Sequence, residues 1–93
     1  MNFLELFNGV ARSARPVHVS HTPVTDTELD LVEYGLDSLD MLMICIYMCE
    51  LYGIPEETGK EMPAKTVREI EDFVMTHRTQ QPETVAQALE SIQ

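Results

Sequence analysis

The chain has 93 residues, which is enough for one small domain with a single core and excludes a large enzyme cleft. Hydrophobic residues make up 44% of it, so global disorder is not expected, and no apolar run is long enough to span a bilayer. The formal net charge of −10 disfavours nucleic acids and anionic membranes as partners.

The negative charge is concentrated in the middle of the chain. No Lys or Arg occurs between Arg15 and Lys60, and the nine acids of residues 16–59 give this segment a charge of −9, while the remainder carries −1. Such a field steers a protein towards basic patches on other proteins. An acidic surface that only aids solubility is the commoner explanation of a charge excess alone.

The amino-terminal part of the sequence predicts one helix and a long connection. Residues 2–14 repeat apolar residues at helical spacing, with Asn2 as the cap. They lack a basic segment followed by an apolar stretch, so we predict no secretion signal and a cytoplasmic protein. Residues 15–35 are rich in Pro, Thr, Ser and His, and should form a long irregular loop with a short turn at "TELDLV".

A second helix is predicted from the apolar run in the middle of the chain. It should begin at Asp37 or Ser38 and continue to about Tyr52, where Gly53 can end it and Pro55 prevents continuation. The run contains two cysteines four residues apart, a spacing that favours reduced thiols over a disulfide framework.

The carboxyl-terminal part predicts two further helices. The stretch "PEETGKEM" should make a short helical turn, and "AKTVREIEDFVMTH" places an apolar stripe on one side of a fourth helix. In residues 82–92, Pro82 suits a first helical turn and apolar residues recur at helical spacing, which predicts a fifth helix. A helix this short is marginal alone, so it must dock on the bundle or on a partner, and disorder is the alternative.

Ser38 lies between two aspartates at the predicted start of the second helix. Gly35 permits the turn, Asp37 is a strong N-cap, and Asp40 completes the pattern of a capping box. Ser38 should therefore be exposed beside unpaired backbone N–H groups, where the helix dipole favours a phosphate on its hydroxyl. Simple helix capping is the commoner role of such a pair.

The surrounding pattern resembles the acyl carrier protein family. The matching stretch is "LVEYGLDSLDMLMICIYMCELYGI", with "GLDSL" as its kernel, and the resemblance extends through "MPAKTVREIEDFV", which is similar to the family's last helix. It covers about residues 2–78. The resemblance implies an all-α fold, a four-helix bundle of acyl-carrier type with a long loop between its first two helices. This domain would occupy residues 1–79, and residues 80–93 would be a C-terminal extension.

The resemblance also implies a function. Such proteins have no catalysis of their own and tether acyl intermediates as thioesters on a 4′-phosphopantetheine arm, which comes from coenzyme A, in type II fatty acid or polyketide-like biosynthesis. By position, Ser38 is the attachment site, and Asp37 and Leu39 are the flanking motif residues. The implied partners are a phosphopantetheinyl transferase and acyl-loading, ketosynthase and other acyl-processing enzymes with basic patches. We expect a monomer without stable membrane insertion.

Residues for partner recognition are expected on and after the second helix. This helix departs from the family's common pattern because it carries no charge between Asp40 and Glu50, so part of its apolar surface must face outward. An exposed Met-rich stripe commonly marks a partner surface and favours a dedicated pathway. The predicted partner-binding residues are Asp40, Met43, Tyr47, Glu50, Glu56 and Glu57.

Apolar residues of the second and fourth helices are candidates for a space that shields an acyl chain, with ordinary core packing as the alternative. These residues are Leu39, Leu42, Ile46, Val67 and Ile70.

Other functions have weaker support. A free-standing peptidyl or aminoacyl carrier uses the same serine chemistry, but often has a second glycine and a polar residue before the serine. An unmodified helical interaction domain or a metal sensor is the other alternative. We predict no metal site, because His18 and His21 have no cysteine nearby and a calcium-loop-like stretch from Asp26 has Leu31 where glycine is required. No "GxSxG" surrounds Ser38, so a serine hydrolase is not expected.

Overall fold

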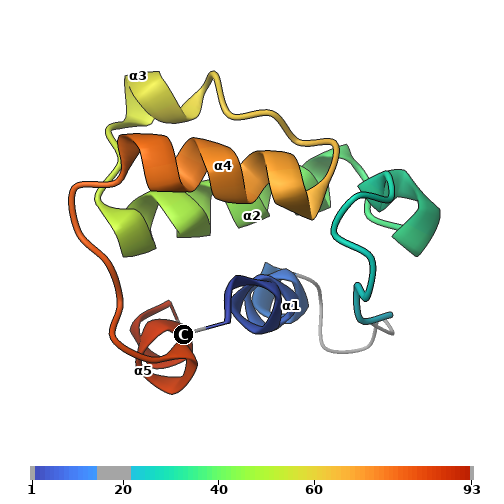
Figure 1. The fold of residues 1–93 in the computed structure, drawn as a ribbon, viewed down its shortest axis with the longest axis horizontal. Helices are drawn as coiled ribbons and strands as arrows, with labels where there is room; N and C mark the ends of the chain where they lie inside the picture. The colour runs from blue at the N-terminus through green and yellow to red at the C-terminus, as the bar shows by residue number, and fades with distance from the viewer. Residues whose placement is uncertain (1, 15–21, 93) are drawn as a thin grey trace.

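The structure is a computed structural model that describes residues 2–14 and 22–92 (Figure 1). Within these residues, all regular structure is helical and no strand occurs, which confirms the all-α prediction at the level of a helical bundle. The helices are α1 (Phe3–Ala14), the 3₁₀-helix η1 (Leu31–Tyr34), α2 (Ser38–Tyr52), α3 (Glu56–Gly59), α4 (Val67–His77) and α5 (Val85–Ser91). Across the described part of the chain, no helix has both the length and the apolar character needed to cross a membrane.

Helix α1 packs against α2 and α4 on one side and against α5 on another. In Figure 1 it is seen end-on below α2 and α4, with α5 beside it. It contacts α2, α4 and α5, and α3 contacts α2. Its start follows the prediction, because the Asn2 side chain accepts a hydrogen bond from the Glu5 N–H at 3.2 Å. Its buried residues form one stripe against the core: Phe3, Leu6, Phe7, Val10 and Ala11.

The connection between α1 and α2 is fixed to the bundle over its described part. Asn8 of α1 donates to the Val24 carbonyl at 2.9 Å and accepts from the Val24 N–H at 2.7 Å. Further along, the Leu31 N–H donates to the Lys65 carbonyl at 2.8 Å. These bonds hold the segment that leads into Ser38. The histidine pair at positions 18 and 21 lies outside the described residues.

Helix α2 has the predicted bounds and a well-defined end. Gly53 has a left-handed backbone with φ 64°, as a C-terminal glycine cap requires. The Thr79 and Gln80 N–H groups both donate to the Tyr52 carbonyl, at 2.9 and 3.2 Å. The chain after α4 therefore satisfies a carbonyl that would otherwise be unpaired at the end of α2.

Helix α5 is shorter than predicted. The sequence predicts a helix over 82–92, but α5 begins after Thr84, whose hydroxyl accepts from the Gln87 N–H at 3.0 Å. A threonine cap fixes a helix start more firmly than the proline two residues earlier. The helix docks on α1, where a Cβ added to Gly9 would come within 2.6 Å of the Leu89 side chain. Of the alternatives left open by the sequence, docking on the bundle is the one observed.

Candidate functional site

Ser38 is the first residue of α2 and its side chain is exposed. Asp37 precedes it as the N-cap: its Oδ1 accepts from the Asp40 N–H at 2.8 Å, and the Asp40 Oδ2 accepts from the Asp37 N–H at 3.1 Å. The predicted capping box is thereby confirmed. Among the described residues, none is hydrogen-bonded to the Ser38 hydroxyl, which leaves it available for chemistry.

The backbone that presents Ser38 is held on both sides. Before it, Gly35 ends η1 with φ 81°, a left-handed conformation that favours glycine, and Leu36 is buried in the core. After it, Met41 is buried on the inner side of α2. The exposed Ser38 hydroxyl thus lies between two residues, Leu36 and Met41, that are buried in the core, so the position of its backbone is well defined.

An open groove begins at Ser38 and follows α2. Its first part, about 770 Å³, is lined by Ser38, Leu42 and Cys45 of α2 and by residues of η1 and the α3–α4 loop. Its second part, about 480 Å³, is lined by α2 and α3 and shares Leu42, Cys45, Gly59 and Lys60 with the first. Because the two parts share these residues, we treat them as one feature, the α2–α3 groove.

The outward side of α2 is apolar, but it is not the side that the sequence predicted. Leu39, Leu42 and Ile46 are exposed, with 66%, 56% and 44% of their surface accessible. Met43 and Tyr47, the predicted partner residues, are only half-buried, and Tyr47 packs against the core. The exposed stripe on α2 therefore consists of Leu39, Leu42 and Ile46, and we call it the outer face of α2.

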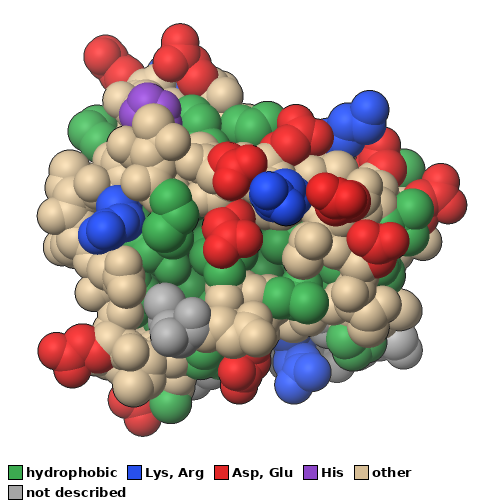
Figure 2. Space-filling model, in the orientation of Figure 1, with side chains coloured by type: hydrophobic (Ala, Val, Ile, Leu, Met, Phe, Trp, Pro, Cys, Tyr) green, Lys and Arg blue, Asp and Glu red, His purple; other side chains and the backbone are tan. Residues whose placement is uncertain are grey.

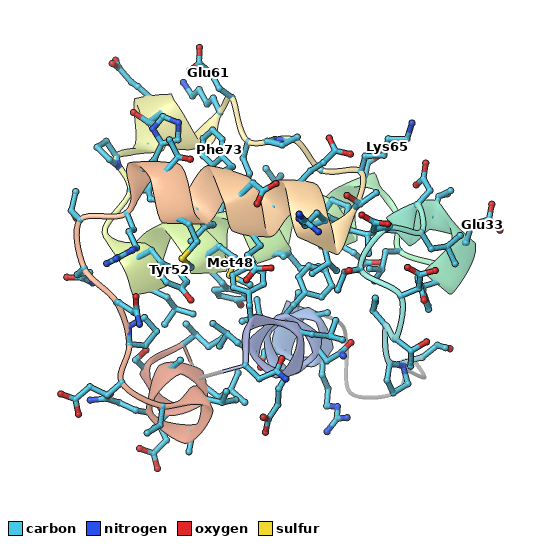
Figure 3. The ribbon with its side chains drawn as sticks, viewed as in Figure 1. Glu33, Met48, Tyr52, Glu61, Lys65 and Phe73 are labelled. Atoms are coloured by element: carbon cyan, nitrogen blue, oxygen red, sulfur yellow. The ribbon has the colours of Figure 1, made fainter. Side chains whose placement is uncertain are left out.

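The rotation of α2 explains this correction. The Asp40 carboxylate turns back into the capping box and is buried, so the residues that follow it at helical spacing face the core. Ile44 and Met48 are fully buried, and Met48 and Tyr52 point from α2 towards α1 in Figure 3. Because α2 is apolar all round, its sequence carries no contrast that could show which side faces inward.

The five residues considered for a space that shields an acyl chain do not lie together, and for Val67 and Ile70 the structure shows the alternative, ordinary core packing. Leu39, Leu42 and Ile46 lie on the outer face of α2, whereas Val67 and Ile70 of α4 are fully buried. The first three residues border the surface and the other two belong to the core, so they do not line one space. The α2–α3 groove, which Lys60 and Gly59 also line, was not predicted, since its far wall comes from residues distant in sequence.

The predicted acidic residues divide into two groups. Glu50, Glu56 and Glu57 are exposed, and the first two line the second part of the α2–α3 groove. Asp40 is only 8% exposed and its carboxylate serves the capping box, which does not support a direct role in partner recognition. Figure 2 shows further acidic side chains spread over the face that carries α4.

The two thiols of α2 are half-buried. Burial raises the pKa of Cys45 to about 11, and the neighbouring Cys49 contributes to the rise; burial also raises the pKa of Cys49. Both side chains are therefore neutral thiols near pH 7. In the described part of the chain, no group of three or more His, Cys, Asp and Glu side chains could hold a metal ion.

Comparisons of the chain with protein-family models, with curated proteins and with solved structures find no match in any of the three.

Proposed function

We propose that this protein is a carrier that tethers acyl intermediates as thioesters on a 4′-phosphopantetheine arm at Ser38, for type II fatty acid or polyketide-like enzymes. The observation that carries the proposal is the setting of Ser38. It is exposed at the start of a long helix, and Asp37, rather than Ser38 itself, makes the cap. A serine that only capped the helix would hold the position that Asp37 has.

The surroundings of Ser38 suit a phosphodiester. The amino end of a 15-residue helix carries a partial positive charge and free N–H groups, which favour an attached phosphate. The N–H groups of Asp40 and Met41 are already bonded to Asp37, so those at the very start of α2 are the ones left for a phosphate. The Asp37 carboxylate opposes this attraction, and its use in the cap reduces that effect.

The α2–α3 groove supports the same function. When bound, the arm supplies the thiol that bears the acyl group. The groove starts at Ser38 and continues past Leu42 and Cys45, whose side chains offer an apolar surface. Its residues can bind a flexible chain there and reduce the access of water to it.

The outer face of α2 and the acids beside the groove are suited to transient partners. Leu39 and Leu42 are exposed next to Ser38, and Glu56 and Glu57 lie on the neighbouring α3. An enzyme with an apolar patch and a basic rim would complement this surface. Electrostatic attraction of this kind raises the rate of association without requiring tight binding, as a carrier that visits several enzymes needs.

Modification by a transferase tests the proposal. The protein is incubated with coenzyme A and a broad-specificity phosphopantetheinyl transferase, and its intact mass is measured. We expect the wild type and Ser91→Ala to gain one phosphopantetheinyl group, and Ser38→Ala to gain none while it keeps its helical circular-dichroism spectrum. A labelled Ser38→Ala would contradict the assignment of Ser38. An unlabelled wild type would favour an unmodified helical interaction domain.

A further inference from the structure

Cys45 and Ser38 share one side of α2. They are seven residues apart, which in an α-helix is almost two full turns and about 10 Å along the axis. Both line the first part of the α2–α3 groove. A pantetheine chain is longer than two helical turns, so a thiol carried on Ser38 can reach the thiol of Cys45 within the groove.

Cys49 is placed differently, although it lies on the same side of the helix. It lines only the second part of the groove, and its sulfur packs against α3, where a Cβ added to Gly59 would come within 2.5 Å of it. The two cysteines are also poorly placed to bridge one another. Cβ atoms four residues apart in a helix are separated by about 5–6 Å, whereas a disulfide needs about 3.5–4.5 Å.

We infer that Cys45 is the site at which the thiol of an arm on Ser38 is stored as an intramolecular disulfide when the protein meets a low-molecular-weight disulfide such as oxidised glutathione. This inference rests on the proposed function. It gives the groove a second use, which is to hold the unloaded arm and protect its thiol from irreversible oxidation.

The reaction balances with the oxidant named. One molecule of oxidised glutathione accepts two electrons and its S–S bond breaks, while the S–H bonds of Cys45 and of the arm break and one S–S bond forms between them. The two protons end on two molecules of glutathione. The reaction proceeds by two successive thiol–disulfide exchanges, and the second is intramolecular, so the tether gives it a high effective concentration.

The raised pKa of Cys45 slows this reaction near neutral pH, because the Cys45 thiolate must attack a disulfide in one of the two exchanges, so closure should become faster as the pH rises. Because burial raises its pKa, Cys45 is almost entirely protonated near pH 7 and is a weak nucleophile towards a thioester. It would not remove acyl groups from the arm.

Chemical cleavage at methionine can identify the linkage. The protein is loaded at Ser38, verified by intact mass, exposed to oxidised glutathione, and cleaved with cyanogen bromide without reduction. Met41, Met43 and Met48 place Ser38, Cys45 and Cys49 in three different fragments. We expect a monomer that has lost two hydrogens, in which the Ser38 fragment is linked to the fragment of residues 44–48.

Two variants provide the matched comparison. Cys49→Ser should close as the wild type does, whereas Cys45→Ser should form at least tenfold less of the intramolecular disulfide. Closure through Cys49, equal closure in Cys45→Ser, or only glutathionylated protein and arm-to-arm dimers would overturn the inference while the loading at Ser38 still stood. A protein that does not load at Ser38 would overturn the proposed function and this inference together.

Discussion

Helices α1 and α2 pack against each other, but they differ on the side that faces away from the core. One side of each faces the core. The other side of α1 is covered by α5, which places Leu89 against Gly9. The corresponding side of α2 exposes Leu39, Leu42 and Ile46. Because no helix of the described residues covers the outer face of α2, this difference is consistent with the proposal that this face, next to Ser38, contacts transient partners.

The largest expected effect is the difference in stability loss between substitutions on the buried side and on the exposed side of α2. Ile44→Ala removes a fully buried side chain and should lower the free energy of unfolding by about 2–5 kcal/mol, the usual range for such cavities. Leu42→Ala, on the outer face, should change it by no more than about 0.5 kcal/mol. Urea denaturation of both variants measures the difference.

The same pair of variants tests whether the outer face has a use. Leu42→Ala should slow the transfer of the arm to Ser38 although it leaves the fold intact, because it removes apolar contact area beside the serine. If Leu42→Ala were as destabilising as Ile44→Ala, the outer face would be part of the core. If it were neutral in both measurements, the outer face would not contribute to recognition by the transferase.

The next largest effect is expected from removing α5, the helix that packs on α1. Deleting residues 82–93 removes α5 and should lower the free energy of unfolding by roughly 1–2 kcal/mol, since a modest apolar contact is lost and few ordered residues are released. The cut leaves Thr79 and Gln80 in place, because their N–H groups cap the end of α2. Thermal unfolding and binding of an apolar dye measure the result.

Modification of Ser38 is the control for this deletion. The site lies on α2 and α5 contacts α1, so the shortened protein should accept the arm at an unchanged rate. An unchanged melting temperature would show that α5 adds no stability to the bundle.

A smaller effect is expected at the start of α2. Asp37→Ala removes the side-chain cap and should cost about 0.5–2 kcal/mol, the range found for N-cap replacements. Asp37→Asn keeps an oxygen that can accept from the Asp40 N–H, and should cost clearly less. Equal losses in the two variants would mean that the charge of Asp37, rather than its hydrogen bond, stabilises the helix.

Local signals in the sequence predicted the parts of the fold that local chemistry determines. The capping box, the glycine at the end of α2 and the amphipathic pattern of α1 each act within a few residues, and the structure has them as predicted. The uniform apolar run of α2 gives no such signal, so the sequence could not show that Leu42 and Ile46 are more exposed than Met43 and Tyr47, which are half-buried. The groove beside it could not be predicted, because α3 and the α3–α4 loop form its far wall and their distance from α2 is set by tertiary packing.

The smallest expected effect is a loss of folding stability at alkaline pH. It arises from half-buried groups of α2, chiefly the thiol of Cys45. Burial raises the pKa of Cys45 from 9.0 to about 11, and it raises those of Cys49 and Tyr52 in the same direction. The unfolded chain therefore releases these protons at a lower pH than the folded chain does, so ionisation favours unfolding.

The stability that depends on neutral Cys45 should be fully present below pH 9 and should be lost as the pH rises towards 11. The pKa of Tyr34 is lowered, mainly by a hydrogen bond from the Asp26 backbone, and its contribution has the opposite sign. The effect of Cys45 will be modest because the thiol is only half-buried and solvent screens its charge. Urea midpoints measured under reducing conditions should fall across this range in the wild type and less steeply in Cys45→Ser. An identical slope in the two proteins would show that the thiol is as well solvated in the folded state as in the unfolded state, which would place Cys45 outside the apolar wall of the α2–α3 groove.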